Sequence, residues 1–243
     1  MLKILLLIFT ASILGAENIA IPTMNFSLSA PDTPQQLVSS LNVLVFLTVL
    51  FLAPSLVLVM TTFTRFIIVF GFLRQALGTQ QVPPTQLLVM IAMVLTFFVM
   101  EPIATNGYEA GIKPYIEKKI GYEEAFDKTV LPFKNFMVRN TREKDLALFF
   151  RIRKMGNPAT VADVPLSLII PAFVISELKT SFEIGFLLFL PFLVIDMVVA
   201  SILMSMGMMM LPPVMISLPF KILVFVLIDG WSLIIGNLIA SIK

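Results

Sequence analysis

A stretch of 33 residues from Gly185 to Ser217 contains a single charged side chain, that of Asp196. About 20 consecutive apolar residues form a helix that spans the hydrocarbon layer of a membrane, so this stretch predicts a membrane-type helix. Near its end, Gly207 and the pair Pro212–Pro213 predict a break in the helix. A helix of this kind needs lipid or another apolar protein surface around it. The chain is therefore expected to be a membrane protein or a core subunit of a membrane assembly.

Methionines crowd the predicted break. Because Met is unbranched and polarizable, clustered methionines make a surface that deforms around another molecule and closes again. A pore lined by them is one interpretation, and gap filling in a helix bundle is the other. Composition alone favours gap filling, whereas the concentration of Met at a helix break supports the pore. The residues concerned are Met204, Met206, Met208, Met209, Met210 and Met215.

The overall composition agrees with a membrane protein and excludes most catalytic chemistry. The chain is 58% hydrophobic and 13% charged, whereas soluble domains are about half apolar and a quarter charged. A net charge of +2 is too balanced to indicate nucleic-acid binding. The chain has no Cys and no His, which removes thiolate chemistry, disulfides, the usual zinc sites and imidazole mechanisms. We expect no enzyme activity, no cofactor and no metal.

Charged residues divide the chain into regions. Of 32 charged side chains, 20 lie between Glu101 and Asp163. Residues 101–164 are therefore predicted to form a polar helical domain between apolar helices at 37–100 and 165–243.

The N-terminus predicts which side of the membrane this polar domain occupies. Residues 1–16 have the pattern of a secretory signal peptide, the alternative being an uncleaved anchor, and residues 17–36 follow as an extended segment. A signal peptide followed by two passes places the polar domain outside the cytoplasm. Its 11 Lys and Arg would favour the cytoplasm by the positive-inside rule, but that rule weakens for loops of about 60 residues.

Prolines and polar residues set the expected helix ends. Pro54 and Arg65 predict two helices, at about 40–60 and 61–76. A helix from residue 86 is expected to end at Glu101–Pro102, and Pro132 is expected to break a helix of the polar domain. The spacing from Asn140 to Glu143 matches a capping box that opens another helix. Apolar segments at 166–178 and 186–210 and a last helix at 215–242 complete the expected order.

Charged residues inside the apolar segments need partners. For Arg65 the leading interpretation is an ion pair between helices or subunits, and Glu177 and Lys179 are further candidates for such pairs. Asp196 and Lys221 lie about 16 and 8 residues from the Pro212–Pro213 turn. They are then not level within one hairpin, so a pair between neighbouring subunits is predicted.

Two other functions stay open at this point. A secondary transporter or proton channel would use the intramembrane residues Arg65, Asp196 and Lys221. An intramembrane hydrolase would use Ser217 and Lys221, which have i, i+4 spacing, but no oxyanion or orienting group accompanies them.

Two long motifs resemble the signatures of the FliP family of flagellar biosynthesis proteins and its virulence secretion relatives. They are PAFVISELKTSFEIGF at 171–186 and PFLVIDMVVAS at 191–201. LGTQQVPPT at 77–85 and MGMMMLPP at 206–213 agree with the same family. Ser181 stands where the family more usually has Ala. The resemblance covers essentially the whole chain after residue 37.

The resemblance implies an all-α core subunit of the flagellar type III protein export gate. In this family about five copies join one FliR-type and several FliQ-type subunits around a channel, with other export gate proteins and membrane lipid as neighbours. Unfolded flagellar subunits pass through that channel across the bacterial inner membrane. Membrane-associated helical hairpins build a helical oligomer in the flagellar basal body, and the polar domain is periplasmic.

The resemblance also assigns a role to the methionines. In the family a methionine-rich loop forms a gasket at the channel constriction, and Met208, Met209 and Met210 are the matching positions. Met204 belongs to the same run, and Met206 stands where the family often has Leu. Because the chain contains no Gly-rich phosphate-binding loop of the P-loop form, the energy for transport is expected to come from another protein.

Overall fold

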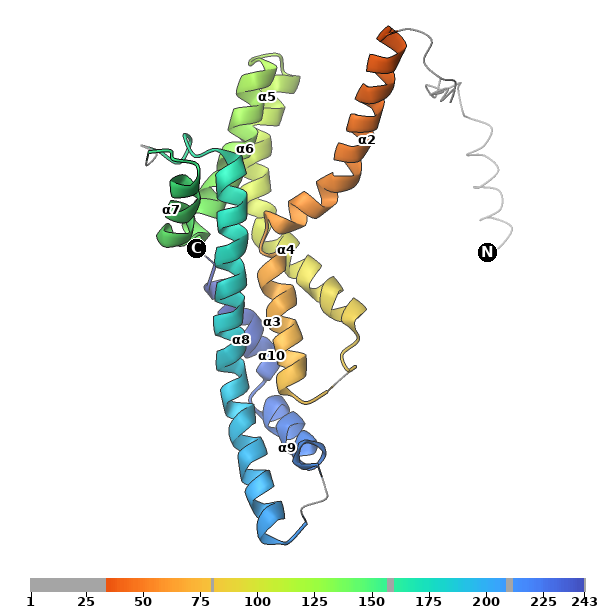
Figure 1. Cartoon of the computed structure of the whole chain (residues 1–243), viewed down its shortest axis with the longest axis vertical. Coiled ribbons are helices and arrows are strands. Elements are labelled where there is room, and N and C mark those ends of the chain that lie inside the picture. The colour runs from red at the N-terminus through yellow and green to blue at the C-terminus, as the bar shows by residue number, and fades with distance from the viewer. Residues whose placement is uncertain (1–33, 80, 157–159, 209–211, 243) are drawn as a thin grey trace, which may run out of the picture. The chain divides into compact units, whose positions relative to one another are not determined.

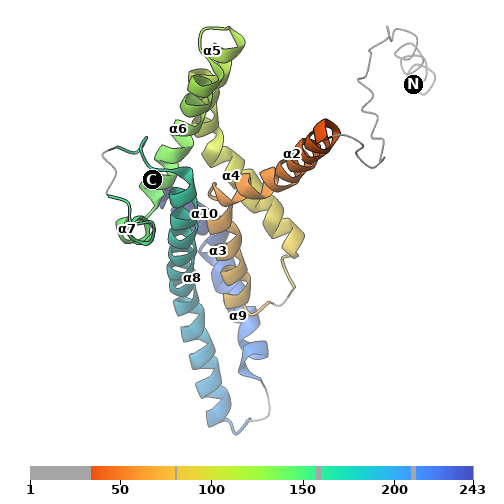
Figure 2. The same cartoon turned by 45° about the horizontal axis from the view of Figure 1, so that its top comes forward.

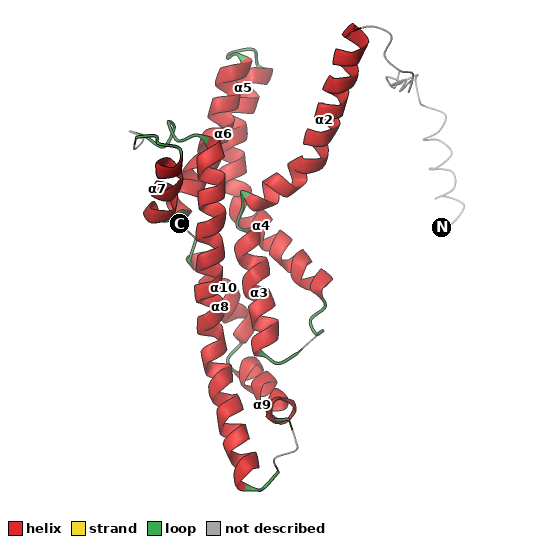
Figure 3. Ribbon diagram, in the orientation of Figure 1, coloured by secondary structure: helices red, strands yellow, loops and turns green. Residues whose placement is uncertain are grey.

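A computed structural model describes residues 34–79, 81–156, 160–208 and 212–242, and all regular structure in these residues is helical (Figure 3). The predicted all-α class is confirmed. The predicted signal peptide at 1–16 and the predicted extended segment up to residue 33 lie outside the described residues. The chain has two parts, residues 1–49 and residues 50–243. The first part holds most of helix α2 (Pro34–Val59), and the second holds its end and the helices that follow.

The second part is organised along one long helix, α8. Helix α3 lies along α8, and α9 folds back against it (Figures 1 and 2). Helices α6 and α7 pack on the N-terminal half of α8, and α4 contacts first α3 and then α6. The elements are α3 (Phe63–Ala76), α4 (Thr85–Gly107), a π-helical turn η1 (Tyr108–Ile112), α5 (Lys113–Ile116), α6 (Tyr122–Asn140), α7 (Glu143–Ile152), α8 (Leu166–Ser205), α9 (Pro213–Leu227) and α10 (Gly230–Ala240).

Two apolar clusters form the core. The first joins five helices, and its buried residues include Phe66 of α3, Ala92 of α4, Phe192 of α8, Phe225 of α9 and Leu238 of α10. Burying a Phe or Leu side chain of this kind contributes about 1.5–3 kcal/mol. This cluster therefore holds the two halves of the apolar sequence together.

The second cluster attaches the polar domain to α8. Phe136 and Met137 of α6 and Phe150 of α7 are buried against Ile169 and Phe173 of α8. The rings of Phe136 and Phe173 meet edge to face, with their centroids 5.8 Å apart. The charged segment thus carries an apolar stripe that docks on the start of α8, while its charged side chains stay exposed.

Proline does not end helices in this chain as predicted. Helix α4 passes through Pro102 and bends (Figure 1), and α6 passes through Pro132. The two segments predicted at 166–178 and 186–210 form the single helix α8, which contains Pro171 and Pro191. A proline inside a helix costs about 3 kcal/mol through one lost hydrogen bond and a steric clash. Tertiary packing of these long apolar helices offsets that cost.

The predicted break after the methionine-rich segment is confirmed, but the last helix differs from its prediction. Helix α8 ends at Ser205, Gly207 has a φ of +74°, and α9 begins at Pro213. The helix predicted at 215–242 is two helices, α9 and α10, bent by 65°. Asp229 occupies the left-handed region at the bend, with φ 50° and ψ 53°.

Among the described residues, two helical stretches are long and apolar enough to cross a membrane, Thr85–Ile116 and Leu166–Ser205. The bent pair α9–α10 is a third if it counts as one span. Helix α8 has 40 residues. At about 1.5 Å per residue it is about 60 Å long, twice the thickness of the hydrocarbon layer. A bilayer crossed at a right angle covers about half of α8, so the rest of its apolar surface requires another cover.

We expect Gly111→Ala to destabilise the protein. A Cβ at residue 111 would lie 2.1 Å from Thr129 Oγ1 and 2.5 Å from the backbone oxygen of Ala125, so η1 and α6 would have to separate. Overpacking of this kind costs about 1–3 kcal/mol, and thermal unfolding in detergent should show a lower Tm. Gly71→Ala is the matched control, because no atom lies within 4 Å of an added Cβ there. A Tm that falls equally in both variants would contradict the explanation.

Candidate functional site

Among the described residues, Arg65 on α3 and Glu177 on α8 form the most deeply buried ion pair. Arg65 Nε donates a hydrogen bond to Glu177 Oε2 over 2.8 Å, and Arg65 Nη2 donates to Glu177 Oε1. The two side chains are 3% and 1% exposed. This is the two-pronged geometry in which a guanidinium binds a carboxylate most strongly. Arg65 and Glu177, 112 residues apart in sequence, therefore form one ion pair between helices.

Arg65 also reaches two further helices. Its Nη1 donates to the backbone oxygen of Ser241 over 3.0 Å and to Ser241 Oγ over 2.9 Å, directly after α10. Its Nη2 lies 3.5 Å from Asn140 Oδ1 at the end of α6. Neither contact was predicted from the sequence. Asn140 is the last residue of α6, and α7 begins at Glu143 without a side-chain cap, so the predicted capping box is wrong.

A second ion pair joins α8 to α9. Lys221 Nζ donates to Asp196 Oδ2 over 2.6 Å and to the backbone oxygen of Ala76 over 3.1 Å. Ser217 Oγ donates to Asp196 Oδ1 over 2.5 Å. The side chains of Lys221 and Asp196 are 3% and 26% exposed. We call Asp196, Ser217 and Lys221 the α8–α9 clamp.

The clamp corrects the expectation that Asp196 pairs with a neighbouring subunit, because its partner Lys221 belongs to the same chain. That expectation counted the residues of both helices up to Pro212–Pro213, as if the connection consisted of these two prolines alone. The connection actually begins after Ser205, which lies nine residues beyond Asp196, while Lys221 lies eight residues beyond Pro213. The two charges are therefore level along their helices.

The same geometry argues against the intramembrane hydrolase. The single hydroxyl proton of Ser217 is directed at Asp196 Oδ1, 2.5 Å away, with the backbone oxygen of Val214 as a second acceptor at 3.1 Å. Lys221 donates to a carboxylate and a carbonyl and makes no hydrogen bond to Ser217 Oγ. A nucleophilic serine needs a base within hydrogen-bond reach, and Lys221 is engaged elsewhere.

The methionines stand beyond the clamp, where α8 turns toward α9. Met204, Met206 and Met208 are 60%, 65% and 37% exposed. Gly207, between the last two, has no atom within 4 Å of an added Cβ, so the bend lies in open space. Met209 and Met210 lie outside the described residues. A hollow of about 400 Å³ separates α8 from α9 between clamp and bend, and it is lined by Val194, Ile195, Val198, Val199, Ile202, Leu203, Ile216 and Phe220.

Lys179 does not belong to either buried pair. Its ammonium lies 3.6 Å from Glu183 on the same helix, and both side chains are about half exposed. Arg142 of the α6–α7 connection also approaches Glu183, over 3.6 Å. A hydrogen bond from the neighbouring Lys179 lowers the pKa of Lys144 on α7. Exposed charges of this kind contribute little to stability.

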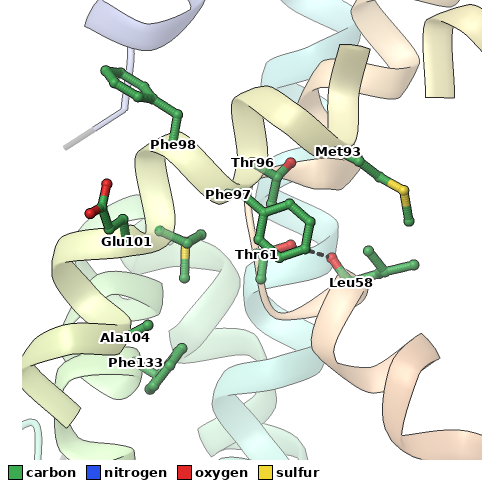
Figure 4. A pocket seen from close by; sticks show the side chains of 10 residues that line it. Leu58, Thr61, Met93, Thr96, Phe97, Phe98, Glu101, Ala104 and Phe133 are labelled. Carbon is green, nitrogen blue, oxygen red and sulfur yellow. Dashed lines mark hydrogen bonds between the residues drawn. The ribbon is translucent and has the colours of Figure 1, made fainter. Parts of the chain in front are cut away.

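A second hollow, of about 500 Å³, lies between the end of α2, α4 and α6 (Figure 4). The hydroxyls of Thr61 and Thr96 donate their protons to the backbone oxygens of Leu58 and Ala92, so those protons are not available to a ligand. Glu101 is its one charged lining residue. This hollow therefore offers mainly apolar contact area. Its lining residues are Leu58, Thr61, Met93, Thr96, Phe97, Phe98, Met100, Glu101, Ala104 and Phe133.

We expect removal of one partner of the buried pair to cost far more than removal of an exposed charge. Glu177→Gln leaves the Arg65 guanidinium buried without a counter-charge, which costs about 3–5 kcal/mol. Lys179→Met should change stability by less than about 1 kcal/mol.

The measurement is thermal unfolding in detergent, with Arg65→Met combined with Glu177→Leu as a third variant. Because that combination removes both charges, it should be more stable than Glu177→Gln alone. If Glu177→Gln unfolds at the same temperature as Lys179→Met, the buried pair does not hold the helices together.

Comparison with known proteins places this arrangement in a family. The model of the FliP family matches residues 46–238. Curated relatives named flagellar biosynthetic protein FliP include one from Bacillus subtilis, 53% identical over 86% of this chain and 94% of the relative. Another, from Caulobacter vibrioides, is 54% identical over 81% of this chain and 74% of the relative. A third, from Treponema denticola, is 47% identical over 91% of this chain and 82% of the relative. The matched range contains both buried ion pairs and the methionine-rich bend, and the chain therefore belongs to the FliP family.

Proposed function

We propose that this protein is the channel-forming core subunit of the flagellar type III protein export gate. Several copies, about five by the family resemblance, enclose a channel together with FliQ-type and FliR-type subunits. Unfolded flagellar proteins cross the bacterial inner membrane through that channel. Membership of the FliP family supports the setting. The observation that carries the channel role is the exposure of Met204, Met206 and Met208 at the bend between α8 and α9.

Exposed methionines suit a seal that must open for many different chains. An unfolded protein presents every kind of side chain in turn, so the contact surface needs to repack without sequence preference. Thioether side chains do this because they are flexible and polarizable. Several copies contributing Met to one ring make an apolar constriction that resists water and ions when no chain is present. Met209 and Met210 extend the same run in sequence.

The α8–α9 clamp gives the bend a fixed base and a movable tip. Asp196 and Lys221 fix α9 on α8 about nine residues before the bend. Beyond the clamp, Leu203, Ile216 and Phe220 line an apolar hollow of about 400 Å³ between the two helices. Apolar contacts are not directional, so the first turn of α9, before Ser217, can shift while the hydrogen bond from Ser217 to Asp196 stays in place. A gasket needs both a fixed attachment, which the clamp provides, and a movable end, which the apolar hollow allows.

The apolar surface of α8 supports assembly into an oligomer. Phe186, Leu187 and Val194 are 65%, 62% and 59% exposed in the single chain. The helix is about twice as long as the hydrocarbon layer is thick. We propose that neighbouring subunits cover the part of its apolar surface that lipid does not reach. We place the assembly in the inner membrane and the flagellar basal body, with residues 101–164 on the periplasmic side.

The geometry favours a structural role for the buried charges over a transporter or proton channel. Arg65 and Glu177 occupy each other's hydrogen-bonding groups and are almost closed to solvent. Lys221 is bound on two sides, by Asp196 and by the backbone oxygen of Ala76. A proton relay requires water access and a group free to exchange its proton. These residues instead fix the helices that carry the bend.

We expect Met208→Ala, Met209→Ala and Met210→Ala, combined in one variant, to increase ion leakage through the assembled complex. Alanine removes most of the apolar volume that closes the constriction but keeps helix-forming and turn-forming residues unchanged. The measurement is membrane conductance in cells that produce the variant together with its partner subunits.

Met90→Ala is the matched control, because Met90 is 63% exposed on α4, away from the bend. It should leave conductance unchanged. Intact-complex mass measurement of both variants checks that assembly persists. Unchanged conductance in a correctly assembled triple variant would overturn the gasket role.

A further inference from the structure

Two charged residues in the apolar segments have no ion-pair partner among the described residues. Arg65 pairs with Glu177, Lys221 with Asp196, and Lys179 with Glu183. The remaining cation and the remaining anion make no ion pair with any described residue. The charged residues of segments 37–100 and 165–242 are Arg65, Arg74, Glu177, Lys179, Glu183, Asp196, Lys221 and Asp229, and the two left over are Arg74 and Asp229.

Asp229 places a carboxylate on an apolar surface. It sits at the bend between α9 and α10 in the left-handed region, and its side chain makes no capping hydrogen bond to α10. Around it Val226, Leu227 and Ile228 are 68%, 74% and 54% exposed. A carboxylate among side chains that must be covered by lipid or protein is costly unless a cation is buried with it. Asp229 has no basic partner among the described residues, and another copy of the chain can supply one.

Arg74 presents the complementary group. It lies in the last turn of α3, where its Nη1 donates to Thr85 Oγ1 over 2.9 Å and approaches the backbone oxygen of Pro83 at 3.5 Å. Its Nε and Nη2 make no hydrogen bond to the described residues. These two atoms form the edge through which Arg65 holds Glu177. Arg74 thus offers a second guanidinium edge of the same geometry with no carboxylate on it.

Arg74 on α3 and Asp229 before α10 lie at similar positions when both are measured along the axis of α3. The ring of Trp231, two residues after Asp229, contacts the ring of Phe70 on α3, with centroids 6.3 Å apart. Phe70 is four residues before Arg74, which is about 6 Å along the helix. The two unpaired groups are therefore within about one helical turn of each other in height, yet they do not meet inside one chain.

We infer that Asp229 of each copy binds the Nε–Nη2 edge of Arg74 in a neighbouring copy. The inference rests on the proposed function, because it requires several copies of the chain in one complex. The two groups belong to different surfaces, so the contact is heterologous and repeats from copy to copy around an axis. Their similar height allows that repetition in a ring or a shallow helix. The contact fixes the order and register of neighbouring copies.

Glu101 is another acidic candidate for Arg74, and its position disfavours it. Arg74 is bonded to Thr85 at the start of α4. Glu101 is 16 residues farther along α4, about 24 Å by helical rise. A neighbouring copy at the same position along the α3 axis therefore places its Asp229 level with Arg74 and its Glu101 far from Arg74.

Cysteine cross-linking tests the contact directly, because the natural chain has no Cys. The full chain carrying Arg74→Cys and Asp229→Cys is purified with its membrane neighbours and treated with a short bifunctional maleimide. We expect a ladder of covalent dimers, trimers and larger species on a denaturing gel. The matched control carries Glu101→Cys and Asp229→Cys and should give no ladder.

The same samples are weighed as intact complexes, which separates failure of this contact from failure of the proposed function. A multi-copy complex without a ladder, or with cross-links confined to single chains, overturns the contact and leaves the proposed function standing. A chain that forms no multi-copy complex overturns both.

Charge exchange gives a second test. Asp229→Arg alone and Arg74→Asp alone should each lower the yield of assembled complex by at least about tenfold, because each places like charges together. The double variant restores the pair with its charges exchanged and should recover most of the yield. A double variant no better than either single variant overturns the proposal.

Discussion

The buried ion pair of Arg65 and Glu177 is the interaction on which the fold depends most. Apolar helices pack through contacts that are weakly directional, and several registers of one helix on another bury similar area. The pair removes that ambiguity, since a charge left without its counter-charge in this environment costs several kcal/mol. Ser241 and Asn140 extend the same network to α10 and α6. One guanidinium therefore fixes the register of four helices.

Helix α8 carries the acids of both ion pairs between helices, and the helices packed against it carry both bases. Glu177 and Asp196 are 19 residues apart on α8, about 28 Å by helical rise. Arg65 on α3 reaches the first, and Lys221 on α9 reaches the second. A register shift of α3 or α9 along α8 would separate a pair, so α8 acts as the reference for both. The continuity of α8 through Pro191, which lies between the two acids, is necessary for this spacing.

Sequence reasoning succeeded where local chemistry decides and failed where tertiary distances decide. The all-α class and the break at Gly207 follow from hydrophobicity and turn residues, and the structure has both. The partner of Asp196 was assigned to another subunit because the length of the connection between α8 and α9 is not visible in the sequence. The predicted helix ends at Pro102 and Pro132 are wrong, because tertiary packing offsets the free-energy cost of a proline inside a helix.

The chain satisfies its buried polar side chains internally and leaves its apolar surface to neighbours. Among the described residues the hydroxyl of Thr62 is the one buried side-chain polar atom without a hydrogen-bond partner. By contrast, Phe186 and Leu187 on the middle of α8 are more than 60% exposed. Polar groups need directional partners and are best paired while the single chain folds, whereas apolar surface accepts any apolar cover. Folding and assembly thus use different residues. Substitutions in the Arg65–Glu177 and Asp196–Lys221 ion pairs are therefore expected to change the stability of the single chain. Substitutions on the outer face of α8 are expected to change its contacts with lipid or neighbouring subunits.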